Sequence, residues 1–479
     1  MKNKSAKILL VDAPVTMEER YGRFHAFGSF LPPYGLLSIA SVLKNNGYDV
    51  EIIESDSLEQ GYDKLYSKIC DANIPYIGIS ATTLSIRSAA QVARSIKNRF
   101  PQKHIIIGGC HVSAIPKETM SEFPDFDIAV IGEGEYAFLD LVRALESKDD
   151  LSSIDGIAFR RNGGIQLTKN RKMIRELDRI PLPAWEMLEG FPHRYLPAGH
   201  KVRRLPATHI ITSRGCPNQC IFCDRTVFGS VYRYFSLEYL KGLFELLYSK
   251  FGIREISIED DTFLIKKERV VGLCEWLISK KIALSWTCNG RVDSIDRDVL
   301  RLMKRAGCWQ IGFGIESGNQ NILSFIKKNV TLNQIREAVE LTSKAGICTK
   351  GFFILGFPHE TEETLQATIN FAKSIKLDDI TVSFMTPFPG SDFYKTAGAY
   401  GSFSKDWKQM NMLNVVFIPQ NLTHDKLVFY HKKMIRAFYL RAPIIFKHIV
   451  FFALNIYFIQ SVFKRIGILA KSGLRNKRR

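Results

Sequence analysis

The final part of this 479-residue chain lacks acidic side chains. Between Lys426 and Arg479 the sequence contains thirteen Lys or Arg and neither Asp nor Glu. The whole chain carries a formal net charge of +18, so the first 425 residues account for only +5. The basic character therefore belongs to the tail. It does not indicate a nucleic-acid partner, because no recognisable nucleic-acid-binding module accompanies it.

The tail also lacks an uninterrupted apolar span. Lys447, His448, Asn455 and Gln460 break the apolar stretch of residues 441–471 before about 18 uncharged residues are complete, which disfavours a transmembrane helix. Two alternatives stay open. A basic, aromatic helix would lie on an anionic membrane surface, or the helix would pack on the rest of the protein and end in a solvated RNKRR sequence.

We expect neither a secretory leader nor a disulfide framework. The first residues, MKNKSAKILLVDAP, lead directly into a pattern typical of a buried strand, and the nine Cys are an odd number scattered along the chain. We therefore expect a reducing, cytoplasmic environment in which most of these thiols are small core residues. The length exceeds the roughly 250–300 residues at which single cores stop growing, so two or more domains are expected.

Residues 1–150 alternate short apolar runs with helical patterns. Strands are predicted at 7–14, 49–56, 76–82, 104–111 and 126–134, and helices at 35–46, 85–100 and 135–146. Such alternation is typical of parallel strands joined by crossover helices. We therefore expect an α/β fold that begins with a doubly wound, Rossmann-like parallel-sheet domain.

Ligands of doubly wound sheets bind beyond the carboxyl ends of the strands, where this sequence places mostly small or polar residues. These candidate contacts are Ser80, Thr82, Gly108, Gly109, His111, Gly132, Glu133 and Gly134. Glycines at strand ends let a bulky group approach the backbone. Tight turns without a ligand would produce the same pattern.

The character of the sequence changes after residue 150. Residues 151–205 are predicted to be a linker with a hairpin that turns at Asn162-Gly163. In residues 206–395, strands are predicted at 208–213, 255–260, 285–290, 309–317, 351–357 and 380–388. Six strand–helix units in about 190 residues favour a partial (βα)6 barrel over an eightfold barrel of about 250. Residues 396–479 are expected to form a basic, apolar, helical C-terminal extension.

Three cysteines follow the first strand of this second array. Cys216, Cys220 and Cys223 form a C-x-x-x-C-x-x-C sequence at the carboxyl end of that strand. Thiolates are preferred ligands of iron–sulfur clusters, and a cluster held by only three of them keeps one iron open, as a catalytic site requires. The alternatives are a zinc site or three unrelated core cysteines. Zinc is disfavoured because structural zinc usually takes four ligands and no second cysteine pair follows.

This motif, placed after the first strand of a six-unit array, resembles that of the radical S-adenosylmethionine superfamily. The resemblance implies a 4Fe-4S cluster on Cys216, Cys220 and Cys223. It also implies that the amino and carboxylate groups of S-adenosylmethionine chelate the open iron, and that reductive cleavage produces a 5′-deoxyadenosyl radical.

The same resemblance implies S-adenosylmethionine contacts around the cysteines and at the strand ends that follow. They are Phe222 beside the adenine, Glu259 and Asp261 toward the methionine portion, Arg291 at the end of the third strand, and Glu316 toward ribose hydroxyls or the amino group. Helix capping explains Asp261, Glu360 and Thr361 equally well.

The pairing of this barrel with a doubly wound domain resembles the cobalamin-binding class of that superfamily, over residues 7–395. The stretches IIIGGCHVSAIP and DIAVIGEGEYAFLDLV stand at positions typical of the class. The resemblance implies that the strand-end candidates of the first domain contact cobalamin. One departure concerns the cobalt: no His has Asp two residues before it, so the D-x-H-x-x-G motif is absent and a histidine lower ligand is not expected. His111 is either a cobalamin contact or a side chain satisfied by a local hydrogen bond.

The class implies methylation of an unactivated carbon, in which one S-adenosylmethionine methylates cobalamin and a second supplies the radical. Radical rearrangement or oxidative cyclisation, as in the anaerobic magnesium-protoporphyrin ester cyclase, uses the same cofactors and stays open. Transfer RNA methylthiolation normally needs three N-terminal cysteines, of which only Cys70 and Cys110 are present. A non-catalytic iron–sulfur protein would normally supply a fourth cluster cysteine.

The expected partners follow from the same reasoning. They are a small-molecule or lipid-like substrate and an electron donor such as flavodoxin or ferredoxin, with no nucleic acid expected. The apolar tail motivates the lipid-like substrate and a peripheral contact of the C-terminal extension with the inner face of the membrane.

Overall fold

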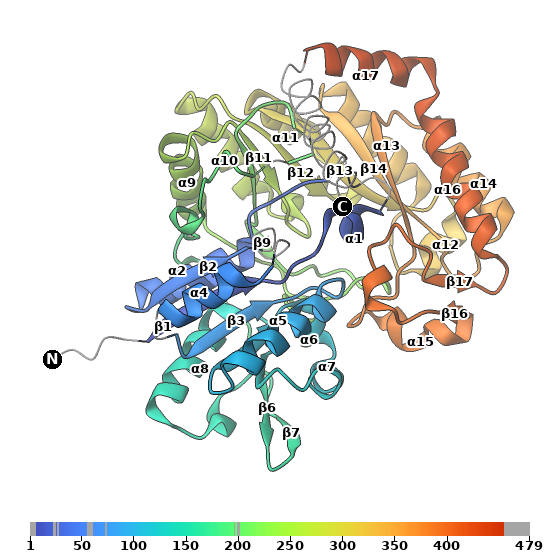
Figure 1. The fold of residues 1–479 in the computed structure, drawn as a ribbon. Helices are drawn as coiled ribbons and strands as arrows, with labels where there is room; N and C mark the ends of the chain where they lie inside the picture. The colour runs from blue at the N-terminus through green and yellow to red at the C-terminus, as the bar shows by residue number, and fades with distance from the viewer. Residues whose placement is uncertain are drawn as a thin grey trace, which may run out of the picture.

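Two large sheets, one mixed and one parallel, dominate the protein (Figure 1). The structure is a computed structural model that describes residues 6–454 apart from 23–24, 26–27, 55–60, 72–73, 196 and 199–201. The first sheet and its helices, blue to cyan in Figure 1, form the lower half of that view, and the second sheet lies in the upper half.

The first sheet has the strand order β2-β1-β3-β4-β5-β6-β7. Its first five strands are parallel. They are β1 (Lys7–Asp12), β2 (Asp49–Ile53), β3 (Tyr76–Ser80), β4 (His104–Gly108) and β5 (Ile128–Val130). The order reverses direction between β1 and β3, and sheets of this topology bind ligands at that point.

Helices cover both faces of the first sheet, as predicted for a doubly wound domain. On β1, Ile8 and Leu10 belong to the core beneath α2 and α8, whereas Leu9 and Val11 belong to a second core beneath α4, α5 and α7. The helices are α2 (Tyr34–Asn45), α4 (Asp63–Asp71), α5 (Ile86–Arg99), α7 (Pro116–Glu122) and α8 (Gly134–Ser147). The sequence prediction missed α4, which has nine residues and buries only a few apolar side chains.

The hairpin predicted within the linker extends the first sheet. β6 (Ile157–Arg161) pairs antiparallel with β5, and β7 (Gly164–Leu167) pairs with β6. Its turn has positive φ at Asn162 (52°) and Gly163 (78°), as predicted for this dipeptide. The hairpin joins the sheet because Ile157 and Phe159 are buried in the core of the first domain. The boundaries at residues 150 and 205 stay a prediction.

The second sheet is the predicted six-stranded half-barrel. All its strands are parallel, in the order β15-β14-β13-β12-β11-β8. They are β8 (Ala207–Ile210), β11 (Glu255–Ile258), β12 (Ser285–Gly290), β13 (Cys308–Glu316), β14 (Cys348–Leu355) and β15 (Asp379–Phe384). The intervening helices are α9 (Leu237–Glu245), α10 (Lys267–Ser279), α11 (Arg297–Arg305), α13 (Leu332–Lys344) and α14 (Glu362–Ser374).

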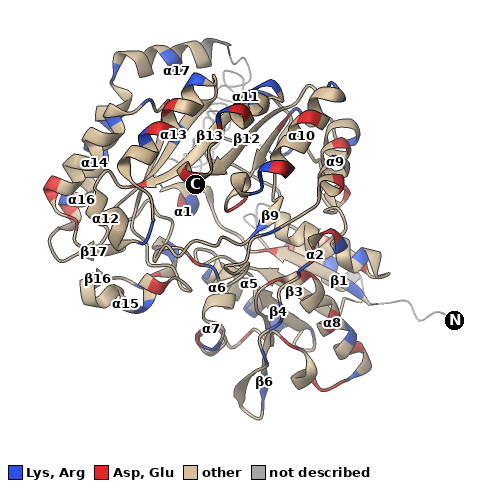
Figure 2. Ribbon diagram, turned by 180° about the vertical axis from the view of Figure 1, so that it is seen from behind, with Lys and Arg blue, Asp and Glu red and all other residues tan. Residues whose placement is uncertain are grey.

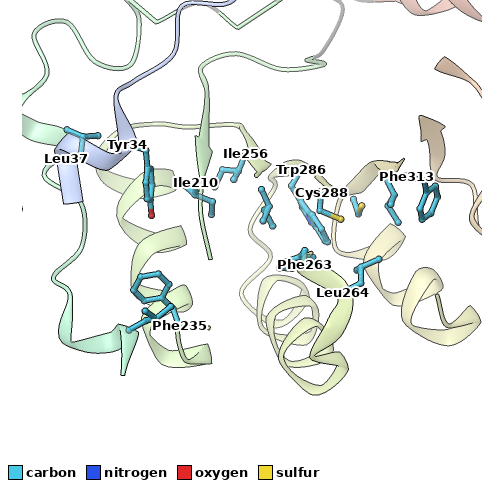
Figure 3. Close-up of a cluster of buried hydrophobic side chains, with 14 of the residues drawn as sticks. Tyr34, Leu37, Ile210, Phe235, Ile256, Phe263, Leu264, Trp286, Cys288 and Phe313 are labelled. Atoms are coloured by element: carbon cyan, nitrogen blue, oxygen red, sulfur yellow. The ribbon is translucent and has the colours of Figure 1, made fainter. Parts of the chain in front are cut away.

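One continuous apolar core joins the two halves. Tyr34 and Leu37 of α2 belong to the same buried cluster as Ile210 of β8 and Phe235, and Figure 3 shows these side chains in one view. The Tyr34 hydroxyl also donates to the carbonyl of Ile211 at 3.1 Å. The carboxyl ends of β1, β3, β4 and β5 therefore meet the second domain across a packed interface.

Shorter elements complete the fold. They are α1 (Met17–Tyr21), α6 (Cys110–Ala114), β9 (Ser213–Arg214), β10 (Arg233–Tyr234), α12 (Gln320–Phe325), α15 (Asp392–Tyr400), β16 (Gly401–Phe403) and β17 (Phe417–Pro419).

The C-terminal extension ends in two helices. α16 (His424–Tyr439) lies beside α14 and the edge strand β15 (Figure 1), and it buries Leu427, Met434 and Phe438. Of the two alternatives for the tail, packing on the barrel is therefore correct for α16. α17 (Ala442–Leu454) follows, and within the described ranges no helix is long and apolar enough to span a membrane. The terminal RNKRR sequence lies outside the described residues.

Candidate cluster and cofactor sites

A buried carboxylate fixes the backbone that leads into the cysteine loop. Asp260 follows β11, and its oxygens accept hydrogen bonds from the Thr212 amide, from the Thr212 hydroxyl (2.6 Å) and from the Ser213 hydroxyl (2.6 Å). Arg269 of α10 lies 3.5 Å from Asp260 and donates to the Thr212 carbonyl at 2.8 Å. The segment between β8 and the cysteines is therefore held by a buried polar network centred on Asp260.

Asp260 was not among the predicted site residues, although the strand pattern contains the signal. Alternate residues of a strand point to the same face. Ile256 and Ile258 are buried, so Asp260 continues their face, while Glu259 and Asp261 are exposed. The middle carboxylate of the Glu259-Asp260-Asp261 sequence is thus the one that supports the loop.

The three cysteines lie on a tight loop at the carboxyl end of β8 and β9. The Cys216 amide donates to the Gly229 carbonyl at 3.3 Å, and the Cys223 amide donates to the Cys220 carbonyl at 3.1 Å. All three thiols are free, with Cys220 buried and Cys223 exposed. Gly215 has φ +82°, and a side chain there would place its Cβ only 2.4 Å from the Val231 carbonyl oxygen.

The charges around this loop suit an anionic metal–thiolate group. Burial raises the pKa of the Cys220 thiol, while the nearby Lys328 and Arg291 act in the opposite direction. Desolvation by the surrounding loop also raises the pKa of Cys223, although part of its side chain is exposed, with a smaller contribution from Asp261. Both thiols would therefore release a proton when they bind iron, and the two cations would offset the charge of the thiolates.

The cysteine geometry does not correspond to a mononuclear metal site. Among the described residues, no group of three His, Cys, Asp or Glu side chains is arranged to hold one metal ion. Cluster cysteines bind separate irons and need not converge on one point. Three free thiols on one loop, with cations beside them, fit the predicted 4Fe-4S cluster.

Glu316 ends β13 in a strained backbone conformation and forms an ion pair with Lys328. It is a non-glycine residue with φ +67°, and its carboxylate accepts from Lys328 Nζ at 2.8 Å, with both side chains buried. Gly314 leaves the space for this pair, because a Cβ there would lie 2.5 Å from the Glu316 carboxylate. A bound ligand would meet this predicted contact as an ion pair rather than as a free carboxylate.

Arg291 and Asp261 support the cysteine loop and its surroundings. The Arg291 guanidinium donates three hydrogen bonds to the Asp293 carboxylate and one to the Lys328 carbonyl at 3.0 Å. Asp261 accepts from the Gly215 amide at 3.2 Å, directly before Cys216. The structure thus shows these two predicted contacts engaged with the protein itself.

The remaining predicted contacts are more open. Glu259 is exposed and accepts from the Ser257 hydroxyl at 2.6 Å and from the Asn289 amide at 3.3 Å. Phe222 packs against Phe357 with ring centroids 5.6 Å apart, which forms an apolar wall beside the cysteines.

The sequence left open whether Asp261, Glu360 and Thr361 cap helices or contact a ligand, and the structure shows a different role for each. Thr361 is the N-cap of α14, because its hydroxyl accepts from the Thr364 amide, whereas Asp261 caps no helix. Glu360 is fully buried and accepts from the amides of Gly356 and Phe357.

A cavity of about 150 Å³ lies at the carboxyl ends of the first sheet, against the second domain. Its walls include the predicted contacts Ser80, Gly108, Gly109, Gly132, Glu133 and Gly134, together with Arg214 and Phe228 from the second domain. Thr82 and His111 do not line it. The structure therefore brings six of the eight predicted residues together.

Glycine makes this cavity possible. Gly109 has φ +110°, and a Cβ there would lie 2.2 Å from the Ala81 carbonyl oxygen, while a Cβ at Gly78 would lie 2.7 Å from the Phe138 ring. A cavity of this size accommodates a small aromatic group, so it fits one portion of a cobalamin rather than the whole molecule. The lining residues and the glycine walls therefore agree with the prediction that part of a cobalamin binds here.

His111 occupies a different environment. It is buried, its Nδ1 lies 3.3 Å from the Thr83 hydroxyl, and its ring packs edge-on against Trp407 with centroids 4.9 Å apart. Burial lowers its pKa to about 4. His111 therefore contacts Thr83 and Trp407 rather than the cavity, and among the described residues no histidine lines that cavity.

Comparison with known proteins identifies the family of the chain. Residues 210–372 match the radical SAM superfamily, and residues 23–142 match the B12 binding domain. The chain is 33% identical over 448 residues to an uncharacterized methyltransferase of Pyrococcus horikoshii, which covers 93% of this chain and 95% of that protein. The chain belongs to the radical SAM superfamily. Its B12 binding domain puts this radical SAM enzyme in the cobalamin-binding class, with a 4Fe-4S cluster, S-adenosylmethionine and cobalamin as its cofactors.

Two further similarities concern sequence and fold. This radical SAM enzyme is 28% identical over 404 residues to the anaerobic magnesium-protoporphyrin IX monomethyl ester cyclase of Rubrivivax gelatinosus, over 83% of this chain and 72% of the cyclase. Its fold resembles that of the radical S-adenosylmethionine methyltransferase TsrM from Kitasatospora setae, solved with cobalamin and a 4Fe-4S cluster bound. The TM-score is 0.67 at 18% identity, over 83% of this chain and 76% of that chain.

Proposed function

We propose that this radical SAM enzyme methylates an unactivated carbon of an apolar small molecule. One observation carries the proposal: Arg214 lines the glycine-walled cavity and stands two residues before Cys216, so the two candidate cofactor sites share a wall. When bound, the cofactors would supply reductive cleavage of S-adenosylmethionine and a transferable methyl group. A shared wall would keep both activities close to one substrate.

The residues of this chain would bind and orient these groups. Cys216, Cys220 and Cys223 would hold the cluster, and the network around Asp260 would keep their loop in place. Phe222 would shield the adenine of S-adenosylmethionine from water. The glycine-walled cavity would hold part of the cobalamin.

The test uses the full chain, reconstituted anaerobically with iron and sulfide. It is supplied with dithionite, hydroxocobalamin, S-adenosylmethionine carrying a deuterated methyl group, and an apolar extract of the cells that make it. A Cys220→Ala variant serves as the control. 5′-Deoxyadenosine from the parent alone, with label in an extracted product, supports methylation. No 5′-deoxyadenosine despite a well-formed cluster would overturn the proposal.

A second candidate function is radical rearrangement or oxidative cyclisation with the same cofactors. The similarity to the Rubrivivax gelatinosus cyclase favours this alternative. Formation of 5′-deoxyadenosine together with a changed product that carries no deuterium would identify it.

We also propose that the C-terminal helices contact an anionic membrane and that the enzyme works at the inner face of that membrane. α16, α17 and the turn between them expose six large apolar side chains: Phe429, Leu440, Ile445, Phe446, Ile449 and Val450. α17 contains Lys447, which pairs with Asp378, and neither Asp nor Glu, and Arg441 directly precedes the helix (Figure 2). Apolar side chains beside cations suit the boundary of an anionic bilayer, from which an apolar substrate would be drawn.

The electron donor is expected to be a small protein such as flavodoxin or ferredoxin. Cys223 is the exposed member of the three cluster cysteines, so its side of the loop offers the shortest route for an electron from outside. Reduction of the reconstituted cluster by a reduced flavodoxin in place of dithionite tests this expectation.

A further inference from the structure

Four buried charged side chains link the two domains beside the cavity. This interdomain ion network consists of Glu133 and Glu135 from the first domain and Arg214 and Arg233 from the second. Arg214 Nη1 donates to Glu133 Oε1 at 2.8 Å, and its Nη2 donates to Glu135. Arg233 Nη1 donates to the two oxygens of Glu133 at 2.9 and 2.8 Å. All four side chains are at most 6% exposed.

The network balances charges that neither domain can balance alone. Arg214 of β9 and Arg233 of β10 are directly paired in the antiparallel register, which places two like charges side by side. Their buried partners are the carboxylates of the first domain, and Ser38 of α2 also donates to Glu135 at 2.8 Å. A buried charge without a partner is strongly unfavourable, so the β9–β10 ribbon depends on the position of the first domain.

The same ribbon carries the cysteine loop. Arg214 ends β9 and is separated from Cys216 only by Gly215. The Gly215 amide donates to Asp261 at 3.2 Å, and the backbone around Gly215 is so close that no Cβ fits. Movement of Arg214 would therefore be passed to Cys216 rather than absorbed between them.

The network also forms part of the cavity wall. Glu133, Glu135 and Arg214 line the cavity together with Phe228. The Arg214 guanidinium lies 5.0 Å from the centre of the Phe228 ring, and Arg233 donates to the Phe228 carbonyl at 2.9 Å. A group that enters the cavity would thus meet the side chains that hold the start of the cysteine loop.

We propose that the interdomain ion network couples occupancy of the cavity to the position of the cluster-binding loop. Its members are positioning residues, and the proposal rests on the proposed function, in which the cavity receives part of a cobalamin and the loop a cluster. Coupling between two sites is reciprocal: if the assembled cluster strengthens cobalamin binding, cobalamin strengthens cluster binding by the same factor.

The experiment measures the dissociation constant of hydroxocobalamin by anaerobic equilibrium dialysis. The full chain is compared with and without its reconstituted cluster, and the ratio of the two constants is the coupling factor. We expect a factor of about five or more for the parent, in the usual range for coupled sites. Glu133→Gln should bring the factor close to one, because it leaves the two arginines without their shared carboxylate.

The ratio separates coupling from direct binding of cobalamin by these side chains. A substitution that only removes a cobalamin-binding group from the cavity wall raises both dissociation constants equally and leaves their ratio unchanged. The matched control is Lys350→Met, which removes the buried pair of Lys350 with Asp379 (3.0 Å) near the opposite end of the half-barrel and should keep the parental factor. Should Glu133→Gln not fold, Glu135→Gln removes one arm of the network and should lower the factor in part.

The outcomes are distinct. A parental factor near one with hydroxocobalamin bound, or a factor unchanged in Glu133→Gln and Glu135→Gln, overturns the coupling and leaves the proposed function standing. Absence of hydroxocobalamin binding in both states overturns the cobalamin part of the proposed function and the coupling with it.

Discussion

The buried carboxyl of Glu360 gives the protein a pH-dependent stability that one substitution should remove. Glu360 is completely buried behind the end of β14, and its only hydrogen bonds among the described residues come from the amides of Gly356 and Phe357. Burial raises its pKa from 4.5 to about 8, because the two amide donors do not make up for the lost water. The folded protein therefore keeps Glu360 protonated at neutral pH.

The sign and size of the effect follow from the two pKa values. Above pH 4.5 the unfolded chain releases this proton while the folded chain retains it, so the free energy of unfolding falls as the pH rises. The loss is about 1.4 kcal/mol per pH unit and ends near pH 8, where both states are ionised. Between pH 5.5 and pH 8 the parent should lose about 3 kcal/mol through this one group.

Glu360→Gln retains an oxygen for the two amides and cannot ionise. We expect the variant to be within about 1 kcal/mol of the parent at pH 5.5 and about 3 kcal/mol more stable at pH 8. The assay is thermal unfolding of the iron-free protein across this range, expressed as the difference between variant and parent. Glu337→Gln, at an exposed position on α13, controls for the loss of one negative charge. A difference between parent and Glu360→Gln that does not change with pH would refute the reasoning.

Three further predictions concern the cavity, the extension and the S-adenosylmethionine site. Gly109→Ala should cost at least about 2 kcal/mol in thermal unfolding, since φ is positive and the new Cβ meets Ala81; unchanged stability would contradict this. Replacing both Phe446 and Ile449 by Ser should weaken sedimentation with phosphatidylglycerol vesicles about tenfold, whereas equal binding would remove the basis for membrane contact. Phe222→Ala should raise the KM for S-adenosylmethionine about two- to tenfold at unchanged iron content, and a lower iron content would instead assign it a structural role.

The membrane prediction uses surface substitutions because truncation would not be informative. A chain that ends near Leu422 would lack α16 as well as α17. Met434 and Phe438 of α16 are buried against the barrel, so their removal would expose the core beside β15. Weaker vesicle binding by such a truncated chain would then report misfolding rather than the removal of a membrane-binding surface.

The sequence predicts the elements and the cysteine loop because both depend on local patterns. Apolar periodicity located every parallel strand of the two sheets to within a few residues, and spacing alone singled out Cys216, Cys220 and Cys223. The sequence prediction missed α4 because this short helix contains only a few buried apolar side chains. The hairpin was recognised from its turn, but its membership of the first sheet depends on pairing with β5, which no local pattern encodes.

The partners of the charged side chains could not be predicted either, because they also depend on contacts between segments that are distant in the sequence. Glu133 and Arg291 were predicted as cofactor contacts, but each has partners from distant positions: Glu133 pairs with Arg214 and Arg233, and Arg291, besides its local pair with Asp293, donates to the Lys328 carbonyl. The assembled fold determines which carboxylates form ion pairs and which stay free to bind a ligand. The alternation of side chains along β11 does predict that Asp260 points to the buried face, and it is the one signal in the sequence that would have identified this residue.

The directly paired arginines of β9 and β10 also have a consequence for how the two domains evolve. A barrel produced without the first domain would hold Arg214 and Arg233 side by side without their counterions, which would favour opening of the ribbon that carries the cysteines. The half-barrel is consequently a poor candidate for exchange between genes as a separate module. A change at Glu133 in one lineage would require compensating changes on both strands of the ribbon, which ties the evolution of the two domains together.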